Sequence, residues 1–309
     1  MIYLEGVSLY FRKKLVLNQL SFRIDRGITT TICGTEGSGK TTLLRVLGGI
    51  VPVSSGLIQI CELNISTNQK KIAEIIGYIP RINKSTDRVT IKEYLNWWAV
   101  FRQIPHPNNR VKQIMGLLNM ENNSNIYLCN LDINFLRLVE FARSILHDPK
   151  IILIEEQSGV GSILENQFVL NVLRELMPGV TIVSSTRHLN NALRNSRMII
   201  IIDKGKILIH DTPRKIKTYL MGLKTIIVQS RGDLRPLMQS ISTLPYISDC
   251  HFSNFDSLEF LTTHENEAQS QIMRLANQLG CEITDFQILQ FPLGIDLLNL
   301  SMEEPRKPD

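Results

Sequence analysis

The chain has 309 residues, of which 43% are hydrophobic and 20% charged, with a formal net charge of +5. This composition is that of a globular protein with room for two domains, and no run of Lys or Arg is long enough to indicate a nucleic-acid-binding arm. The five cysteines are widely spaced and form no CxxC pair, so we expect reduced thiols of a cytosolic protein rather than disulfides or a zinc site. The longest aliphatic run, 198–203, is much shorter than the roughly 20 residues of a membrane helix.

Along the chain, residues 2–24 have the pattern of antiparallel strands, and short β-branched segments then alternate with helical patterns. The expected strands are 28–33, 75–79, 151–154, 180–184 and 198–202. The expected helices are 41–47, 91–101, 135–146 and 165–176. Such alternation predicts an α/β fold with a mainly parallel sheet and helices on both of its faces.

The loop after the strand at 28–33 reads GTEGSGKTT and fits the phosphate-binding pattern G-x-x-x-x-G-K-[ST]. Its glycines let backbone amides wrap around a phosphate, and the N-terminus of the next helix adds positive charge. Lys40 is expected to reach the β- and γ-phosphates of a nucleotide, and the hydroxyl of Thr41 to bind Mg²⁺. The predicted nucleotide-binding residues of this P-loop are Gly34, Thr35, Glu36, Gly37, Ser38, Gly39, Lys40, Thr41 and Thr42.

Two adjacent glutamates, Glu155 and Glu156, follow the apolar strand at 151–154. Taken alone, they indicate no more than the solvated end of a buried strand. A P-loop enzyme, however, needs a carboxylate on the Mg²⁺ side and a group that orients the attacking water. Because successive side chains of a strand diverge, Glu155 is predicted to serve the metal and Glu156 to be the catalytic residue.

Near residue 222 the pattern changes, and from 224 the order of expected elements is strand, helix, strand, strand, helix, strand. This βαββαβ order predicts a small α+β domain of the ferredoxin-like type. The expected domains are therefore 1–221, with the P-loop, and an accessory domain at 222–301. A disordered tail is expected at 302–309.

With these motifs in this order, residues 2–220 resemble the nucleotide-binding subunits of ABC transporters. The matching segments are VLNQLSFRIDRG, SSGLIQI, IIGYIPR, VTIKEYLNWWAVF, FARSILHDPKIILIEE and DKGKILIHDTP. The EYL segment and the C-terminal domain are similar to those of ABC-2-type exporters of drugs, lipids or polysaccharides. The resemblance implies a P-loop NTPase cassette, in which an antiparallel β subdomain and a helical subdomain flank the parallel core sheet.

The resemblance also implies an ATPase that uses ATP and Mg²⁺, lies on the inner face of the cell membrane and drives an integral-membrane permease. Two such subunits dimerise head to tail around ATP. By position, Glu156 falls on the family's catalytic glutamate and Glu155 on its Mg²⁺-side aspartate. Phe11 falls on the aromatic residue that stacks on adenine, with Tyr10 one register away. Simple strand packing is the alternative for both aromatic residues.

Four accessory elements depart from the family pattern. The signature LSGGQ is replaced by LDINF at 131–135, where Asp132 would oppose the partner's γ-phosphate; we favour the alternative that Asp132 is a helix N-cap. Arg81 replaces a glutamine and, having only donors, cannot bind Mg²⁺. Arg187 replaces the switch histidine, either to contact the γ-phosphate or as a solvated loop charge, and the neighbouring His188 is interpreted as a surface residue. The D-loop at 158–162 ends in serine instead of aspartate.

These departures predict slow ATP turnover by the chain on its own, because single catalytic donors commonly matter by about 10²–10³ in rate. A second hypothesis is a catalytically weak regulatory or structural subunit that pairs with an intact ABC paralogue. A heterodimer is favoured over a homodimer under this reasoning. An ABC ATPase outside transport, acting on nucleic acid or the ribosome, is the least favoured, since the chain has one cassette and no coiled-coil insertion.

Overall fold

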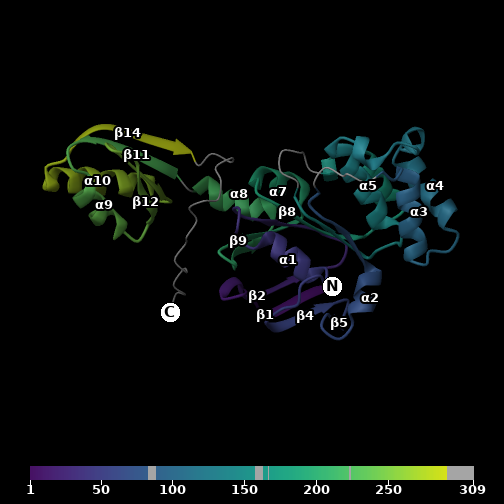
Figure 1. Ribbon diagram of the computed structural model, residues 1–309. Helices are drawn as coiled ribbons and strands as arrows, with labels where there is room; N and C mark the ends of the chain where they lie inside the picture. The colour runs from purple at the N-terminus through teal and green to yellow at the C-terminus, as the bar shows by residue number, and fades with distance from the viewer. Residues whose placement is uncertain (83–87, 157–162, 166, 223, 291–309) are drawn as a thin grey trace. The chain divides into compact units, whose positions relative to one another are not determined.

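The computed structural model describes residues 1–82, 88–156, 163–165, 167–222 and 224–290 (Figure 1). The chain divides into two units, Met1–Asp211 and Thr212–Asp309, so helix α8 (Pro213–Gly222) belongs to the second unit. The domain limits expected from the sequence, with a boundary at 221, stay a prediction. The D-loop and the tail expected at 302–309 lie outside the described residues. Within the described ranges, every helix is too short or too polar to cross a membrane.

An antiparallel sheet begins the first unit and confirms the prediction for residues 2–24. Its strands, in order, are β2 (Lys14–Ile24), β1 (Ile2–Phe11), β4 (Ser55–Ile60) and β5 (Leu63–Asn64). Strand β1 buries Ile2, Leu4, Val7 and Leu9 in the core, as expected of a strand with one face against the rest of the unit.

A second sheet of six strands forms the centre of the unit. Its order is β10 (Lys206–Asp211), β9 (Met198–Asp203), β3 (Thr29–Cys33), β8 (Thr181–Thr186), β7 (Ile151–Ile154) and β6 (Ile76–Ile79). Only β10 pairs antiparallel, and the other pairs are parallel. All four residues of β7 are buried, which explains its continuous aliphatic run. Because β3, β7 and β8 are parallel, the loops that follow them meet at one edge of the sheet.

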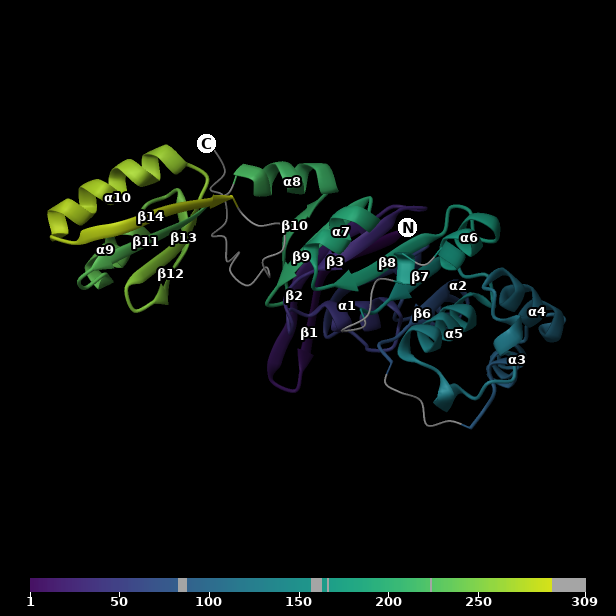
Figure 2. The same ribbon diagram turned by 90° about the horizontal axis from the view of Figure 1, so that it is seen from above.

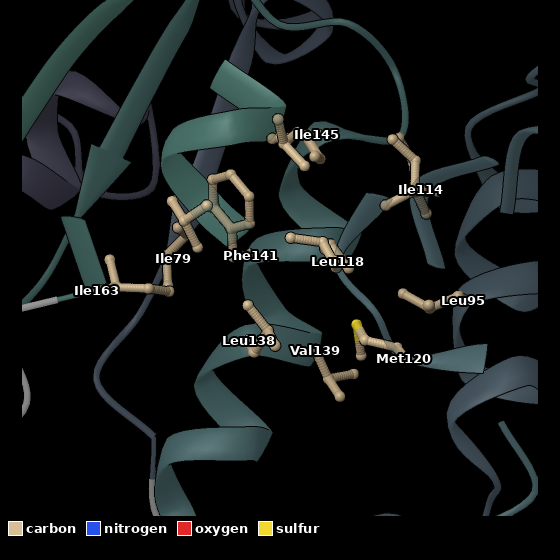
Figure 3. Close-up of a cluster of buried hydrophobic side chains, with 14 of the residues drawn as sticks. Ile79, Leu95, Ile114, Leu118, Met120, Leu138, Val139, Phe141, Ile145 and Ile163 are labelled. Carbon is tan, nitrogen blue, oxygen red and sulfur yellow. The ribbon is translucent and has the colours of Figure 1, made fainter. Parts of the chain in front are cut away.

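The described helices of this unit are α1 (Lys40–Leu47), α2 (Gln69–Ile75), α3 (Ile91–Phe101), α4 (Pro107–Leu117), α5 (Ile133–Ile145), α6 (Gln167–Glu175) and α7 (Leu189–Asn195), with short 3₁₀ turns at Glu121–Asn123, Leu128–Asn130 and Ile163–Glu165. Helices α1, α3, α5 and α6 lie close to their expected positions, whereas α2, α4 and α7 were not expected from the sequence. Figures 1 and 2 show α3 and α4 side by side at one end of the unit. Buried side chains of α3, α4, α5 and β6 form one apolar cluster there, including Leu95, Ile114, Phe141 and Ile79 (Figure 3).

The second unit contains a four-stranded antiparallel sheet after α8. Its elements are β11 (Lys224–Arg231), α9 (Arg235–Ser242), β12 (Ile247–Asn254), β13 (Ser257–Thr262), α10 (Glu265–Leu279) and β14 (Glu282–Gln290), and the strand order is β12-β13-β11-β14. Leu237 of α9 and Ile272 of α10 pack with Ile226, Val228 and Phe260 of the sheet. The element order agrees with the βαββαβ order expected from the sequence, and its classification as ferredoxin-like stays a proposal.

Candidate functional site

A cavity of about 340 Å³ lies at the edge of the central sheet where β3, β7 and β8 end. Its lining residues are Val16, Glu36, Gly37, Gly39, Lys40, Thr41, Thr42, Arg81, Glu156, Ser185 and Arg187. The structure therefore brings six predicted P-loop residues together with the predicted catalytic glutamate, which is more than 100 residues away in the sequence. The volume is within the range of small-ligand sites.

Glycines shape the P-loop for steric and conformational reasons. A Cβ atom on Gly34 would lie only 2.2 Å from the carbonyl oxygen of Ile202 on β9, so the loop is pressed against the neighbouring strand. Gly37 and Gly39 have φ angles of +79° and +109°, in the left-handed region that favours glycine. Gly39 directly precedes α1, whose N-terminus thus points at the loop. This is the cradle geometry that phosphate binding requires.

Lys40 lies under this loop and is only 8% exposed. Its Nζ donates hydrogen bonds to the carbonyl oxygens of Gly34 (2.7 Å) and Thr35 (2.5 Å), and at 3.4 Å to Ser38 Oγ. Burial lowers the pKa of Lys40. Since these three acceptors are neutral oxygens, a phosphate that enters the cavity would add a charged partner for the ammonium group. The cavity lining does not include Gly34, Thr35 or Ser38, whose oxygen atoms accept the hydrogen bonds of Lys40.

Glu156 follows β7 and faces the cavity with a side chain that is 18% exposed. Its position is fixed by the end of the adjacent strand β8. The Glu156 N–H donates to Ser185 Oγ at 3.1 Å, Thr186 Oγ1 donates to Oε1 at 2.9 Å, and the Arg187 N–H donates to Oε2 at 2.7 Å. A carboxylate that accepts hydrogen bonds from two neighbours in this way can orient a small polar molecule, such as water, beside bound phosphates. Its assignment as the catalytic residue stays a prediction.

Glu155 points elsewhere and is not among the lining residues. It is 1% exposed, and its Oε1 accepts hydrogen bonds from the Tyr78 hydroxyl and from Arg45 Nε at 3.2 Å. The Arg81 N–H donates to Oε2 at 3.4 Å. Burial and the bond to Glu155 together raise the pKa of Tyr78. The divergence of the two glutamates is confirmed, but of the predicted Mg²⁺ pair only Thr41 lines the cavity, and the role of Glu155 stays a prediction.

The two aromatic residues at the end of β1 are exposed. Phe11 is 68% and Tyr10 54% exposed, and neither lines the cavity. Stacking of Phe11 on adenine therefore stays a prediction. Val16 of β2, which the sequence reasoning did not select, lines the cavity instead. It carries no polar group, so a search for chemically active residues had no signal by which to find it.

The two arginines that replace family residues both line the cavity. Arg187 Nη1 donates to Glu36 Oε2 at 3.4 Å, and its Nε lies 3.8 Å from Glu156 Oε2. Arg187 is thus an ion-paired residue of the cavity lining, and its two interpretations, a contact with the γ-phosphate or a solvated loop charge, stay predictions. His188 has a 60% exposed side chain, with Nε2 4.0 Å from Glu156 Oε1, which agrees with its interpretation as a surface residue.

The start of α5 occupies the position of the family signature. Asp132 Oδ1 accepts hydrogen bonds from the backbone N–H groups of Asn134 (2.8 Å) and Phe135 (3.0 Å). The prediction that Asp132 is a helix N-cap is confirmed. The first amides of this helix are therefore bonded to a carboxylate of the same chain.

Residues 17–158 match the ABC transporter family. The chain is 25% identical over 241 residues to Nod factor export ATP-binding protein I of Ralstonia nicotianae, which covers 77% of this chain and 74% of that protein. It is 21% identical over 313 residues to the linearmycin resistance ATP-binding protein LnrL of Bacillus subtilis, covering 99% and 95%. With the mouse ABC-type organic anion transporter ABCA8A it shares 30% identity over 195 residues, but spans only 12% of that protein.

Solved structures show the same fold. A dimeric ATP-binding cassette in a post-hydrolysis state, bound to ADP and Pi, superposes with a TM-score of 0.61 at 21% identity and covers 69% of this chain and 99% of that one. The protein cbiO1 from Clostridium perfringens, part of the ABC transporter complex cbiONQ, gives a TM-score of 0.60 at 20% identity, with 70% and 90% covered. Together with the P-loop cavity, these matches show that the chain contains an ABC transporter ATP-binding domain, matched over residues 17–158.

Proposed function

We propose that the chain is the ATP-binding and ATP-hydrolysing subunit of an ABC-2-type membrane exporter. The observation that carries this proposal is the placement of Glu156 in the same cavity as Lys40 and Thr41. Lys40 would bind phosphate oxygens at the loop, and Glu156, held by Thr186 and Arg187, would orient the water that attacks the γ-phosphate. The family match supports the nucleotide assignment.

ATP fits this cavity because the glycine cradle and the buried Lys40 form a site for a polyphosphate. Bound Mg²⁺ would supply positive charge that stabilises the transferred phosphoryl group. We expect the hydroxyl of Thr41 to hold that ion. Glu155, as placed by its bonds to Tyr78 and Arg45, does not fit as a direct ligand and would act on the ion only after releasing these partners.

Export is supported by the name of one relative, a Nod factor export ATP-binding protein. We propose that a membrane permease docks on α3, at the inner face of the membrane. On this helix Trp97, Val100 and Phe101 are 72%, 61% and 73% exposed, and their spacing places them on one face. A group of large exposed apolar side chains is characteristic of a protein interaction site.

Dimerisation around ATP is part of the same proposal, with a heterodimer favoured. Asp132 already occupies the N–H groups of Asn134 and Phe135, and its negative charge would oppose a γ-phosphate presented by a partner. The signature side of this chain is therefore a poor half-site for ATP, whereas its P-loop side is intact. An intact ABC paralogue would complete the site at this chain's P-loop.

The nucleotide assignment is tested by calorimetric titration of ATP into the purified chain and its Lys40→Ala variant. We expect the loss of Lys40 to weaken ATP binding by about 100-fold, since hydrogen bonds to charged groups contribute about 1.5–3 kcal/mol each. Lys71→Ala, at an exposed position on α2, is the matched control and should bind like wild type. Unchanged ATP affinity in Lys40→Ala would contradict the proposal.

A further inference from the structure

Basic groups outnumber acidic groups among the described residues that line the cavity. Three of these residues are basic (Lys40, Arg81 and Arg187) and two are acidic (Glu36 and Glu156), which gives them a formal net charge of +1. Arginine remains protonated at all accessible pH values, and its planar group of donors suits phosphate oxygens. If positions 81 and 187 carried neutral side chains, one basic and two acidic residues would remain, and the net charge of these residues would be −1. The arginines thus add two positive charges, the charge of one Mg²⁺ ion.

The carboxylates at this edge of the sheet are already engaged by donors of the chain. Glu36 pairs with Arg187 Nη1, and Glu156 accepts from Thr186 Oγ1 and the Arg187 N–H. Glu155 is bonded to Tyr78 and Arg45 outside the lining. Within the part of the chain that the structure describes, no group of three or more acidic, histidine or cysteine side chains is arranged to hold a metal ion. The carboxylates of the described lining are thus held by donors of the chain, while Arg81 and Arg187 place guanidinium donors in the cavity.

We infer that Arg81 and Arg187 neutralise the phosphates of the bound nucleotide directly, so that the chain binds ATP without a divalent cation. This inference rests on the proposed function, because it concerns the same cavity and ligand. The two arginines are assigned a role in ATP binding and none in ATP hydrolysis.

Arg187 is able to exchange its present partner for a phosphate at low cost. Glu36 has an 81% exposed side chain, and its contact with Arg187 is 3.4 Å long. Exposed ion pairs of this kind contribute little to stability, and a released Glu36 would be fully hydrated. Phosphate oxygens of ATP offer a stronger, charge-assisted acceptor for the same Nη1 group. Arg81 is exposed at the rim and can likewise turn toward the ligand.

The test measures ATP affinity by calorimetry, in buffer with Mg²⁺ and in buffer with EDTA, for wild type and the double variant Arg81→Gln with Arg187→Gln. Glutamine keeps most of the side-chain length and removes the charge. Wild type should bind ATP equally in the two buffers, to within about threefold. The double variant should lose about tenfold in affinity per arginine in EDTA and recover part of it in Mg²⁺. Arg26→Gln, at an exposed position outside the cavity, is the control and should behave like wild type.

Two results would overturn the inference alone: wild-type affinity that falls about tenfold or more in EDTA, or a double variant that binds ATP as tightly as wild type in EDTA. Both leave the proposed function intact, because ATP still binds. Wild type that fails to bind ATP in either buffer would overturn the proposed function and the inference with it. Circular dichroism of each variant establishes that the substitutions leave the fold unchanged.

Discussion

Replacing Gly34 by alanine tests whether the P-loop is held against the sheet as described. The added Cβ would lie 2.2 Å from the Ile202 carbonyl oxygen, 2.7 Å from Ser38 Oγ and 3.2 Å from Ile202 Cγ2. The nearest of these atoms belongs to the backbone of β9, which pairs with β3 on one side and β10 on the other, so it cannot give way easily. Overpacking of this kind typically costs about 1–3 kcal/mol, and we expect the upper end of this range for Gly34→Ala.

Gly37→Ala is the matched control for this substitution in the same loop. A Cβ there would have no atom within 4 Å, and the only penalty comes from the φ angle of +79°. A left-handed alanine costs about 1 kcal/mol relative to glycine. Urea denaturation, followed by circular dichroism, should therefore show a larger loss of unfolding free energy for Gly34→Ala than for Gly37→Ala. Equal losses, or a Gly34→Ala variant as stable as wild type, would refute the close approach of the loop to β9.

Two further predictions concern stability. Burial lowers the pKa of His147 to about 4, so the folded protein keeps this ring neutral while the unfolded chain takes up a proton below an ordinary pKa of about 6.5. Unfolding free energy should therefore fall by about 2 kcal/mol more in wild type than in His147→Gln between pH 7.5 and pH 5, measured by urea denaturation; equal pH profiles would contradict this. Asp132→Ala should lose about 1 kcal/mol through the missing cap of α5, whereas Asp132→Asn should keep most of it. Identical urea midpoints for these two variants would show that the cap contributes nothing.

Elements with a strong local signal were predictable from the sequence. Helix α3 was expected at its observed bounds, because its apolar periodicity starts after Thr90, whose side chain forms a capping box with Glu93. Helix α5 starts at Ile133, two residues before its expected start, although Asp132 had been recognised as its cap. The apolar pattern alone located the start of α5 less well than the capping residue did.

The chemical groups of the site were predictable from the sequence, but the hydrogen bonds and ion pairs between them were not. Glu155 and Glu156 were expected to diverge, and they do, yet the partners of Glu155 are 77 and 110 residues away in sequence, at Tyr78 and Arg45. Sequence spacing contains no information about such contacts. In the same way, the sequence did not predict the contact of Arg187 with Glu36, because this contact depends on how β3 and β8 bring their loops together.

The most direct test of the central claim is ATP turnover by the purified chain, wild type against Glu156→Gln, with ATP affinity measured in parallel. We predict that wild type hydrolyses ATP. The variant should bind ATP with similar affinity but hydrolyse it at least about 100-fold more slowly, because it has lost the carboxylate that orients water. Turnover by Glu156→Gln at the wild-type rate would contradict the assignment of Glu156 as the catalytic residue.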